Sequence, residues 1–318
     1  MATGGADAHE NALIGLVTIE RDLRAAGLGL VGLDCAAMNG YSTTLGNFSF
    51  GPLPVTITPN TPVAGTDTVT IVHSTSSFGN IPTTLTGPMA TSDAAMTLAN
   101  GDGFQAGDLI MIWEPTKACS LLQASADAVN PGGIWTVAHI PGATAPFNPP
   151  IGTNIFPAGG YATGARVTNM GPAPCCQIPA APAPMVRRDY FIQGTSLMAR
   201  NRNVVDTVVA PANPAALVEG LIGIRAQYGR DTSGDGFIDV YDTTAPATAA
   251  QLVAIRIAVI ARSGQLEKTA VSPSTLTLWQ GGTVANGGAI TLDATAQLYR
   301  YKVYQTTIPL RNVIWTNN

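Results

Sequence analysis

The sharpest chemical motif in the sequence is an acidic stretch of twelve residues, 231–242. Oxygen-bearing side chains stand at its positions 1, 3, 5, 9 and 12, and Gly236 stands at position 6. This is the spacing of an EF-hand calcium loop, in which position 7 supplies a backbone carbonyl. The predicted calcium ligands are Asp231, Ser233, Asp235, Phe237, Asp239 and Asp242. We therefore expect a structural calcium ion (Ca²⁺) at this loop.

The loop departs from the EF-hand pattern at two positions. Ser233 stands where an acid is usual, and Asp242 stands where a longer glutamate normally binds through two oxygens. No pair of helices is predicted on its two sides. The alternative is a plain turn, in which Asp side chains accept hydrogen bonds from nearby backbone N–H groups. The residues alone leave both interpretations open.

The segments on either side of the loop are predicted to be strands, because apolar and polar residues alternate there with a period of two. The predicted strands are 55–58, 67–73, 109–113 as a continuous apolar run, 120–124, 135–139, 190–198 as a hairpin turning at Gln193–Gly194, 217–228, 252–262 and 299–305, and the chain closes on 306–315. Residues 140–186 hold much of the proline and are predicted to be an irregular excursion rather than a hidden helix.

One amphipathic helix is predicted near the N-terminus, over residues 6–26. Its apolar residues recur near helical spacing, with most charged residues on the other side. These apolar residues are Leu13, Leu16, Val17, Ile19 and Leu23. Gly27 and Gly29 are expected to end the helix, as glycine commonly does. The stripe is expected to pack on a β-sheet.

The composition excludes several classes of function. Charged residues make up 11% of the 318 residues, against about 25% in ordinary soluble proteins. The net charge is -4 and no basic cluster exceeds Arg187–Arg188, so nucleic acid is not expected to be the main partner. No apolar run reaches the roughly 20 residues that span a bilayer. Because the common nucleotide-binding, hydrolase and zinc-protease motifs are also missing, we do not expect an enzyme.

The four cysteines, Cys35, Cys119, Cys175 and Cys176, lack the spacing of a structural zinc site. Adjacent cysteines rarely bridge each other, so we favour pairs in which Cys35 and Cys119 each join one of Cys175 and Cys176. The alternative is fewer bridges or none. Bridged cysteines would indicate an oxidising compartment such as the periplasm.

Four segments, in order along the chain, resemble PilW-type minor pilins of type IV pili. They are Ile19–Gly29, the stretch 216–231 that leads into the acidic loop, the strand 253–263, and the end of the chain, 299–312. Residues 60–200 match the family only loosely. Members of the family begin with a short basic leader and about 25 apolar residues, which are not found here. We expect that Met1–Gly5 replaces them and that residues 6–28 are the soluble half of a longer helix.

The resemblance implies an α+β fold: an N-terminal amphipathic helix on a predominantly antiparallel, β-rich pilin-like head with a large β and loop insertion. The implied regions are residues 1–32 for the helix, 33–200 for a head region with the proline-rich excursion, and 201–318 for a C-terminal sheet with the acidic loop. The helical stripe of Leu13, Leu16, Val17, Ile19 and Leu23 then has a second interpretation, because part of it could contact neighbouring subunits.

The function implied by the resemblance is that of a non-enzymatic subunit of the pilus or of its tip-initiating complex. Its implied partners are other minor pilins, the major pilin and, through a preceding segment, the inner membrane. It would lie in the inner membrane and periplasm before assembly and at the cell surface afterwards. Two alternatives remain. One is a type II secretion pseudopilin of the J type. The other is a secreted calcium-dependent adhesin or glycan-binding module, with Tyr228 and Tyr241 as exposed aromatics beside the acidic loop.

Overall fold

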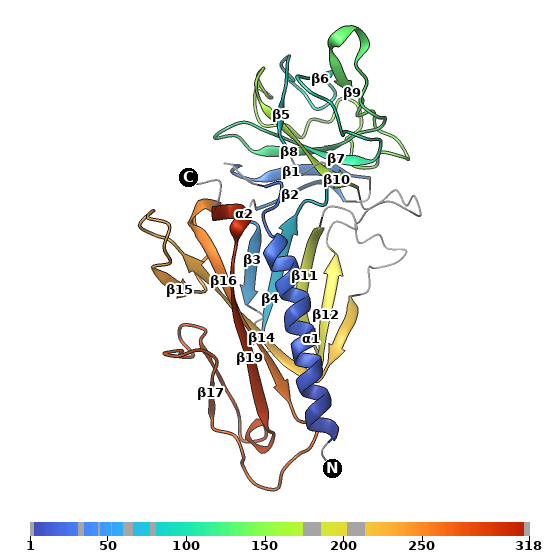
Figure 1. The fold of residues 1–318 in the computed structure, drawn as a ribbon. Coiled ribbons are helices and arrows are strands. Elements are labelled where there is room, and N and C mark those ends of the chain that lie inside the picture. Colours follow the sequence, from blue (N-terminus) through green and yellow to red (C-terminus); the bar gives the residue numbers. More distant parts are fainter. Residues whose placement is uncertain are drawn as a thin grey trace.

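The computed structural model of the chain describes residues 3–30, 35–43, 45–51, 53–59, 66–76, 81–173, 186–201 and 214–314. Its long helix α1 (Thr3–Ala25) lies along a lower body of two β-sheets, and a third sheet lies at the end of the molecule opposite the N-terminus (Figure 1). The α+β class and the predominantly antiparallel pairing predicted from the sequence are confirmed. Among the described residues, no helix combines the length and apolar character needed to cross a bilayer.

The lower body contains a five-stranded and a four-stranded sheet. The first has the order β13-β12-β11-β4-β3, with bounds Ala215–Glu219, Ser196–Asn201, Val186–Gln193, Asp67–His73 and Val55–Pro59. The second has the order β15-β14-β16-β19, with bounds Val240–Asp242, Leu221–Arg230, Leu252–Arg262 and Tyr301–Pro309. All neighbouring strands in both sheets are antiparallel. The two sheets and α1 share one hydrophobic core.

The third sheet, here called the distal sheet, has six strands in the order β2-β1-β8-β7-β10-β5. Their bounds are Gly46–Phe50, Met38–Ser42, Cys119–Gln123, Asp108–Trp113, Arg166–Pro172 and Thr83–Thr84. One pair, β1 with β8, is parallel. All six residues of β7 are buried, because separate apolar clusters cover both faces of the sheet. This explains the unbroken apolar run Leu109–Trp113 in the sequence, since a strand covered on both faces need not alternate.

Four short strands, a short α-helix and three 3-10 turns, at Pro131–Gly133, Ala249–Gln251 and Ala296–Leu298, complete the described structure. β6 (Met96–Leu98) pairs with β9 (Trp135–Val137) above the distal sheet, and β17 (Thr275–Thr277) pairs with β18 (Ala289–Thr291) beside the four-stranded sheet. The helix α2 (Arg311–Ile314) follows β19. The side-chain amide of Asn312 donates to the carbonyls of Arg24, Ala25 and Ala26. The end of the chain thereby donates to carbonyl groups at the C-terminal end of α1, where the helix offers them no further turn; the Ala25 carbonyl also accepts the N–H of Leu28.

Two sequence predictions need correction. Residues 140–186 contain β10, a seven-residue strand in the distal sheet, so this excursion is not irregular throughout. The predicted strand 217–228 is two strands, because Gly220 at φ 80° breaks it and sends β13 and β14 into different sheets. The boundary proposed at residue 200 also falls within the five-stranded sheet, in which β12 pairs with β13.

Candidate functional site: the exposed helix face and the acidic loop

The helix α1 divides its apolar residues between two faces. Leu16, Ile19 and Leu23 are buried in the core that the helix shares with both sheets. Leu13 and Val17, which the sequence grouped with them, are 42% and 62% exposed. Ile14, which the sequence analysis missed, is also exposed. Its signal was its position three residues before Val17, on the same face of the helix.

Gly15 explains how closely α1 approaches the sheets. A Cβ atom at this position would lie 3.1 to 3.2 Å from side-chain atoms of Leu197, Val218 and Leu221. These residues belong to β12, β13 and β14, so a bare glycine lets the helix contact strands of both sheets at one point. One face of α1 is therefore packed against the two sheets of the lower body, and the opposite face remains at the surface.

The exposed helix face consists of Glu10, Leu13, Ile14, Val17, Arg21 and Arg24. Its C-terminal end is basic. Arg24 donates from Nε to Glu20 at 3.1 Å, and Arg21 lies 3.6 Å from a carboxylate oxygen of Asp22. The face is therefore an apolar patch followed by two arginines.

Asp22 lies on the buried face of α1 and binds the helix to strand β11 of the lower body. Its Oδ2 accepts hydrogen bonds from Arg188 Nη1 at 2.8 Å and from the Tyr190 hydroxyl at 2.6 Å. Both partners lie on β11, and Asp22 itself is only 6% exposed. A carboxylate buried this deeply is tolerated because a cation and a hydrogen-bond donor both face it. The rotation of α1 about its own axis is thereby set, and so is the face that it exposes.

The end of α1 is joined to the neighbouring strand by backbone hydrogen bonds. Gly27, at φ 82°, donates its N–H to the carbonyl of Val72, and Ser74 donates to the carbonyl of Leu28. The predicted helix end at Gly27 is confirmed. His73 lies at this junction, buried, with Nδ1 3.0 Å from the carbonyl oxygen of Ser74. Burial lowers the pKa of His73 below its ordinary value.

The acidic loop connects β14 to β15 as a hydrogen-bonded turn. Asp231 accepts backbone N–H groups of Ser233, Gly234 and Gly236 at 3.1, 2.6 and 2.7 Å. Asp239 accepts the N–H groups of Thr232 and Ser233 at 2.7 and 2.9 Å. The backbone bonds from Gly234 and Gly236 lower the pKa of Asp231, and the Thr232 hydroxyl and N–H lower the pKa of Asp239.

The remaining predicted calcium ligands point to other partners. Asp235 accepts the N–H of Phe237 at 2.9 Å, and the Phe237 side chain is 74% exposed. Asp242 forms a two-point pair with Arg230, at 3.1 and 2.6 Å. Among the described residues, no three side chains of His, Cys, Asp or Glu lie together in a way that could hold a metal ion. The groups that face these carboxylates are hydrogen-bond donors: backbone N–H groups, the hydroxyls of Thr232 and Ser233, and the Arg230 guanidinium.

The two tyrosines expected to be exposed beside this loop have other roles. Tyr228 is fully buried, and its hydroxyl accepts the N–H of Ile57 at 2.6 Å, which links the two sheets of the lower body. Tyr241 is half-buried, and the Arg256 guanidinium carbon lies 4.5 Å from its ring centroid. The expectation that Tyr228 is exposed beside the loop is therefore wrong, and Tyr241 is only partly exposed.

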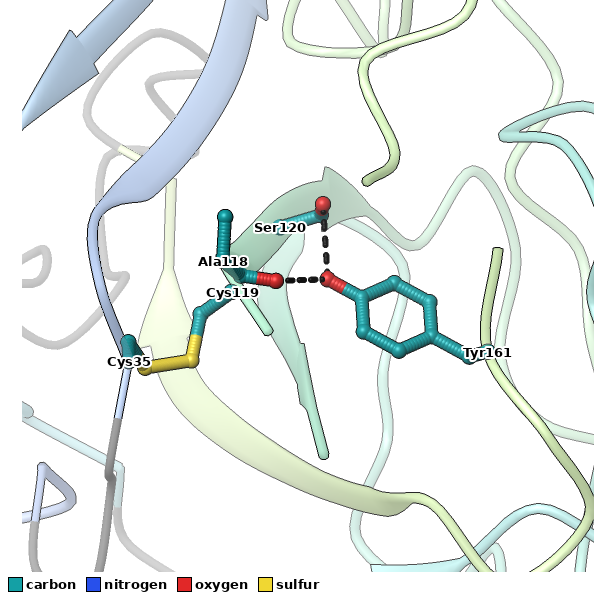
Figure 2. The surroundings of a disulfide bond; sticks show 5 residues. All are labelled: Cys35, Ala118, Cys119, Ser120 and Tyr161. Atoms are coloured by element: carbon teal, nitrogen blue, oxygen red, sulfur yellow. Dashed lines mark hydrogen bonds between the residues drawn. A yellow bond between two sulfur atoms is a disulfide. The ribbon is translucent and has the colours of Figure 1, made fainter. Parts of the chain in front are cut away.

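The disulfide pairing favoured from the sequence is also wrong. Cys35 is bonded to Cys119, and Figure 2 shows the bond beside the start of β8. The parallel pairing of β1 with β8 brings Met38 opposite Cys119, which places the two cysteine Cα atoms 5.4 Å apart. The Tyr161 hydroxyl lies 2.8 Å from both the Ala118 carbonyl oxygen and Ser120 Oγ, next to the bond. Cys175 and Cys176 lie outside the described residues.

The chain is similar to known proteins of type IV pili. Residues 189–312 match the family model of PilW, the type IV pilus-assembly protein W. A type IV-like pilin from Thermus thermophilus is similar in structure at 10% sequence identity and a TM-score of 0.41, over 96% of this chain and 97% of that chain. No curated protein matches the chain significantly. The resemblance found in the sequence is confirmed: from β11 to α2, the chain matches the PilW family of type IV pilus-assembly proteins.

Proposed function

We propose that this protein is a non-enzymatic minor pilin, which acts with other minor pilins in the complex that initiates a type IV pilus and remains at its tip. The observation that carries the proposal is the two-faced helix α1 on a β-rich head. One face anchors the head, and the other presents Leu13, Ile14 and Val17 to the surroundings. The PilW match over residues 189–312 supports the same role.

The exposed apolar face of α1 suits a subunit whose helix is covered by neighbouring subunits. Three large apolar side chains within five residues of one helix form a patch rather than scattered exposure. Covering each of them would contribute roughly 1 to 2 kcal/mol, since burial removes apolar area from water at about 25 cal/mol per Å².

The proposed location is the inner membrane and periplasm before assembly, and the pilus at the cell surface afterwards. The Cys35–Cys119 bond supports this location, because disulfides persist in oxidising compartments. The proposed partners are other minor pilins and the major pilin.

The test is complementation of a strain that lacks the gene. The variant Ile14→Asp with Val17→Asp places two charges on the exposed helix face. We expect surface piliation to fall at least about tenfold, while the melting temperature of the purified protein stays unchanged, because burying a charge in a subunit contact is costly.

The matched control is Leu266→Asp, a residue 53% exposed in a loop after β16. Full piliation by the double variant would contradict the proposal. Lost type II secretion with intact pili would favour the J-type pseudopilin.

We also propose that the acidic loop binds calcium. This proposal rests on the oxygen spacing of residues 231–242, and binding would require Asp231 and Asp239 to turn from their N–H donors toward the ion. Calorimetric titration of calcium chloride into chelator-treated protein tests it, with Asp235→Asn as the matched variant. Asn keeps an oxygen for the Phe237 N–H and removes one charge, so we expect weaker binding with an intact turn. If calcium chloride produces no binding heat and no change in the melting temperature of the native protein, the calcium proposal is wrong.

A further inference from the structure

The face of the four-stranded sheet that carries β17 and β18 holds an arginine without a carboxylate partner. Arg256 lies on β16, and its Nε donates to Gln227 Oε1 at 2.6 Å. Among the described residues, its two terminal amino groups have no hydrogen-bond or ion-pair partner. Arg225 and Arg230, on the neighbouring strand β14, each pair with an aspartate. Burial lowers the pKa of Arg256 below its ordinary value, because no charge compensates the lost water.

Two aromatic rings fix the position of this guanidinium. Its carbon lies 4.5 Å from the ring centroid of Tyr241 and 4.7 Å from that of Trp279. Gly229, on β14, leaves room for the tyrosine ring, since a Cβ atom there would lie 2.8 Å from Tyr241 Cε1. Stacking on aromatic rings restricts a guanidinium without using its N–H groups. Arg256 is therefore held in place while its terminal amino groups keep their donors.

The turn between β17 and β18 completes the cluster. Trp279 opens this turn, and its Nε1 is buried without a hydrogen-bond partner in the part of the chain that the structure describes. Gln227, which is also fully buried, donates from Nε2 to the carbonyl of Asn286 in the same turn. Gln227 thereby joins the turn to Arg256. The cluster has unmatched N–H donors and a positive charge, and such groups favour a ligand with negatively charged oxygens.

We infer that Arg256 and its surrounding cluster form an anion site whose ligand is a carboxylate. A guanidinium binds the two oxygens of a carboxylate through two parallel N–H bonds. Arg256 is the cation that the described residues place against both rings, and its single charge matches a carboxylate better than a phosphate dianion. The carboxylate has two sources, a free acid and the side chain of another protein, and both present the same pair of oxygens.

The site is distinct from the helix face on which the proposed function rests. Arg256 alternates along β16 with Ile255 and Ile257, which belong to the core that α1 shares with the sheets. Neighbouring residues of a strand point to opposite faces of its sheet. Arg256 therefore lies on the face away from α1, and loss of one function would leave the other standing.

The test is a two-dimensional NMR titration that follows the indole N–H signal of Trp279, assigned by its absence in Trp279→Phe. One probe is sodium glucuronate, and the other is the α-amide of N-acetylglutamate, which carries its acid as a protein side chain does. Their neutral counterparts are glucose and the α-amide of N-acetylglutamine. We expect the signal to move with at least one acid and with neither neutral compound. The acid that binds more tightly identifies the source of the carboxylate.

The variant Arg256→Lys keeps the charge and removes the planar pair of amino groups, so we expect Kd for the acid to rise at least about tenfold. The matched control is Arg262→Lys, at another half-buried arginine of β16, which lies 4.3 Å from the ring centroid of Tyr299. It should leave Kd within about twofold, since it does not touch the cluster. Thermal melts show that both variants fold. A signal that neither acid moves, that the neutral compounds move equally, or that inorganic phosphate moves at lower concentration overturns the inference, and so does equal weakening in the two variants.

Discussion

Asp22 is the residue on which the orientation of α1 depends. It lies on the helix, whereas both groups that donate to its Oδ2, Arg188 and Tyr190, lie on β11. Sequence reasoning did not single out Asp22. The structure shows that it faces inward with the apolar residues, because an ion pair and a hydroxyl compensate its burial.

Replacing Asp22 by Asn should lower the free energy of unfolding by about 2 kcal/mol. The change leaves the Arg188 guanidinium without its charged partner, and the figure is below that for fully buried pairs because the Arg188 side chain is 29% exposed. Urea denaturation measures the loss. The matched control is Glu20→Gln, which breaks the more exposed pair with Arg24 and should change stability by less than about 0.5 kcal/mol. If the two variants lose the same free energy of unfolding, Asp22 does not contribute more to stability than an exposed ion pair does.

The buried histidines predict how stability depends on pH. Burial lowers the pKa of His73 and of His139 below 6.5. Near His73, Asp22 acts to raise its pKa and Arg188 to lower it. The unfolded chain therefore takes up these protons at a higher pH than the folded chain, so their contribution to stability is lost as pH falls below about 6.5.

The measurement is urea denaturation between pH 7.5 and pH 5, for the native chain and for the variant His73→Gln with His139→Gln. We expect the free energy of unfolding to fall less steeply with decreasing pH in the variant. Parallel curves would mean that neither histidine is protonated differently in the folded and unfolded chains.

At the scale of the element, the helix α1 shows what periodicity can and cannot predict. Its existence, its extent and its end at Gly27 follow from spacing and from glycine. The division of its apolar residues into a buried and an exposed set does not. Leu13 and Leu23 are the same residue type on the same helix, yet they are 42% and 0% exposed. The sheets beneath the helix decide which of them is covered.

Truncating these two leucines tests the division. Leu23→Ala should cost about 3 kcal/mol in the free energy of unfolding, since it opens a cavity in the shared core. Leu13→Ala should cost less than about 1 kcal/mol, because its side chain is already partly in water. Chemical denaturation of both variants gives the comparison. A larger loss for Leu13→Ala would mean that the assigned faces are reversed.

The strands, like the helix, were predicted only where their signal is local in sequence. Alternation predicted β4 over Asp67–His73 and the hairpin of β11 and β12 at Gly194, because strand propensity and turn residues are local. It missed β10, which lies in a proline-rich segment. It also joined β13 to β14, since apolar character continues through Gly220 while the sheet does not.

At the scale of the whole molecule, the family match and the distal sheet do not overlap. The match covers residues 189–312, which form most of the lower body, whereas every strand of the distal sheet lies before residue 173. The distal sheet is also at the end of the molecule opposite the N-terminus of α1 (Figure 1). The match to the family therefore lies in the lower body.

The Cys35–Cys119 bond should stabilise the distal sheet. It closes a loop with a sequence separation of 84 residues, and a loop of this size removes chain entropy equivalent to about 4.5 kcal/mol from the unfolded state. The variant Cys35→Ser with Cys119→Ser should lose about this much stability, measured by denaturation and compared with the native chain before and after reduction. Unchanged stability in the double variant and the reduced protein would show that the bond contributes nothing.

The sequence by itself determined the local features of this protein: the N-terminal helix, most strands, the turn-forming acidic loop and the resemblance to PilW. These depend on spacing, propensity and short motifs, which act between neighbours along the chain. Only the tertiary structure decided that Cys35 bonds to Cys119, that Tyr228 is buried, and which face of α1 is exposed. Each of these depends on strands far apart in sequence packing together, so no local pattern records it.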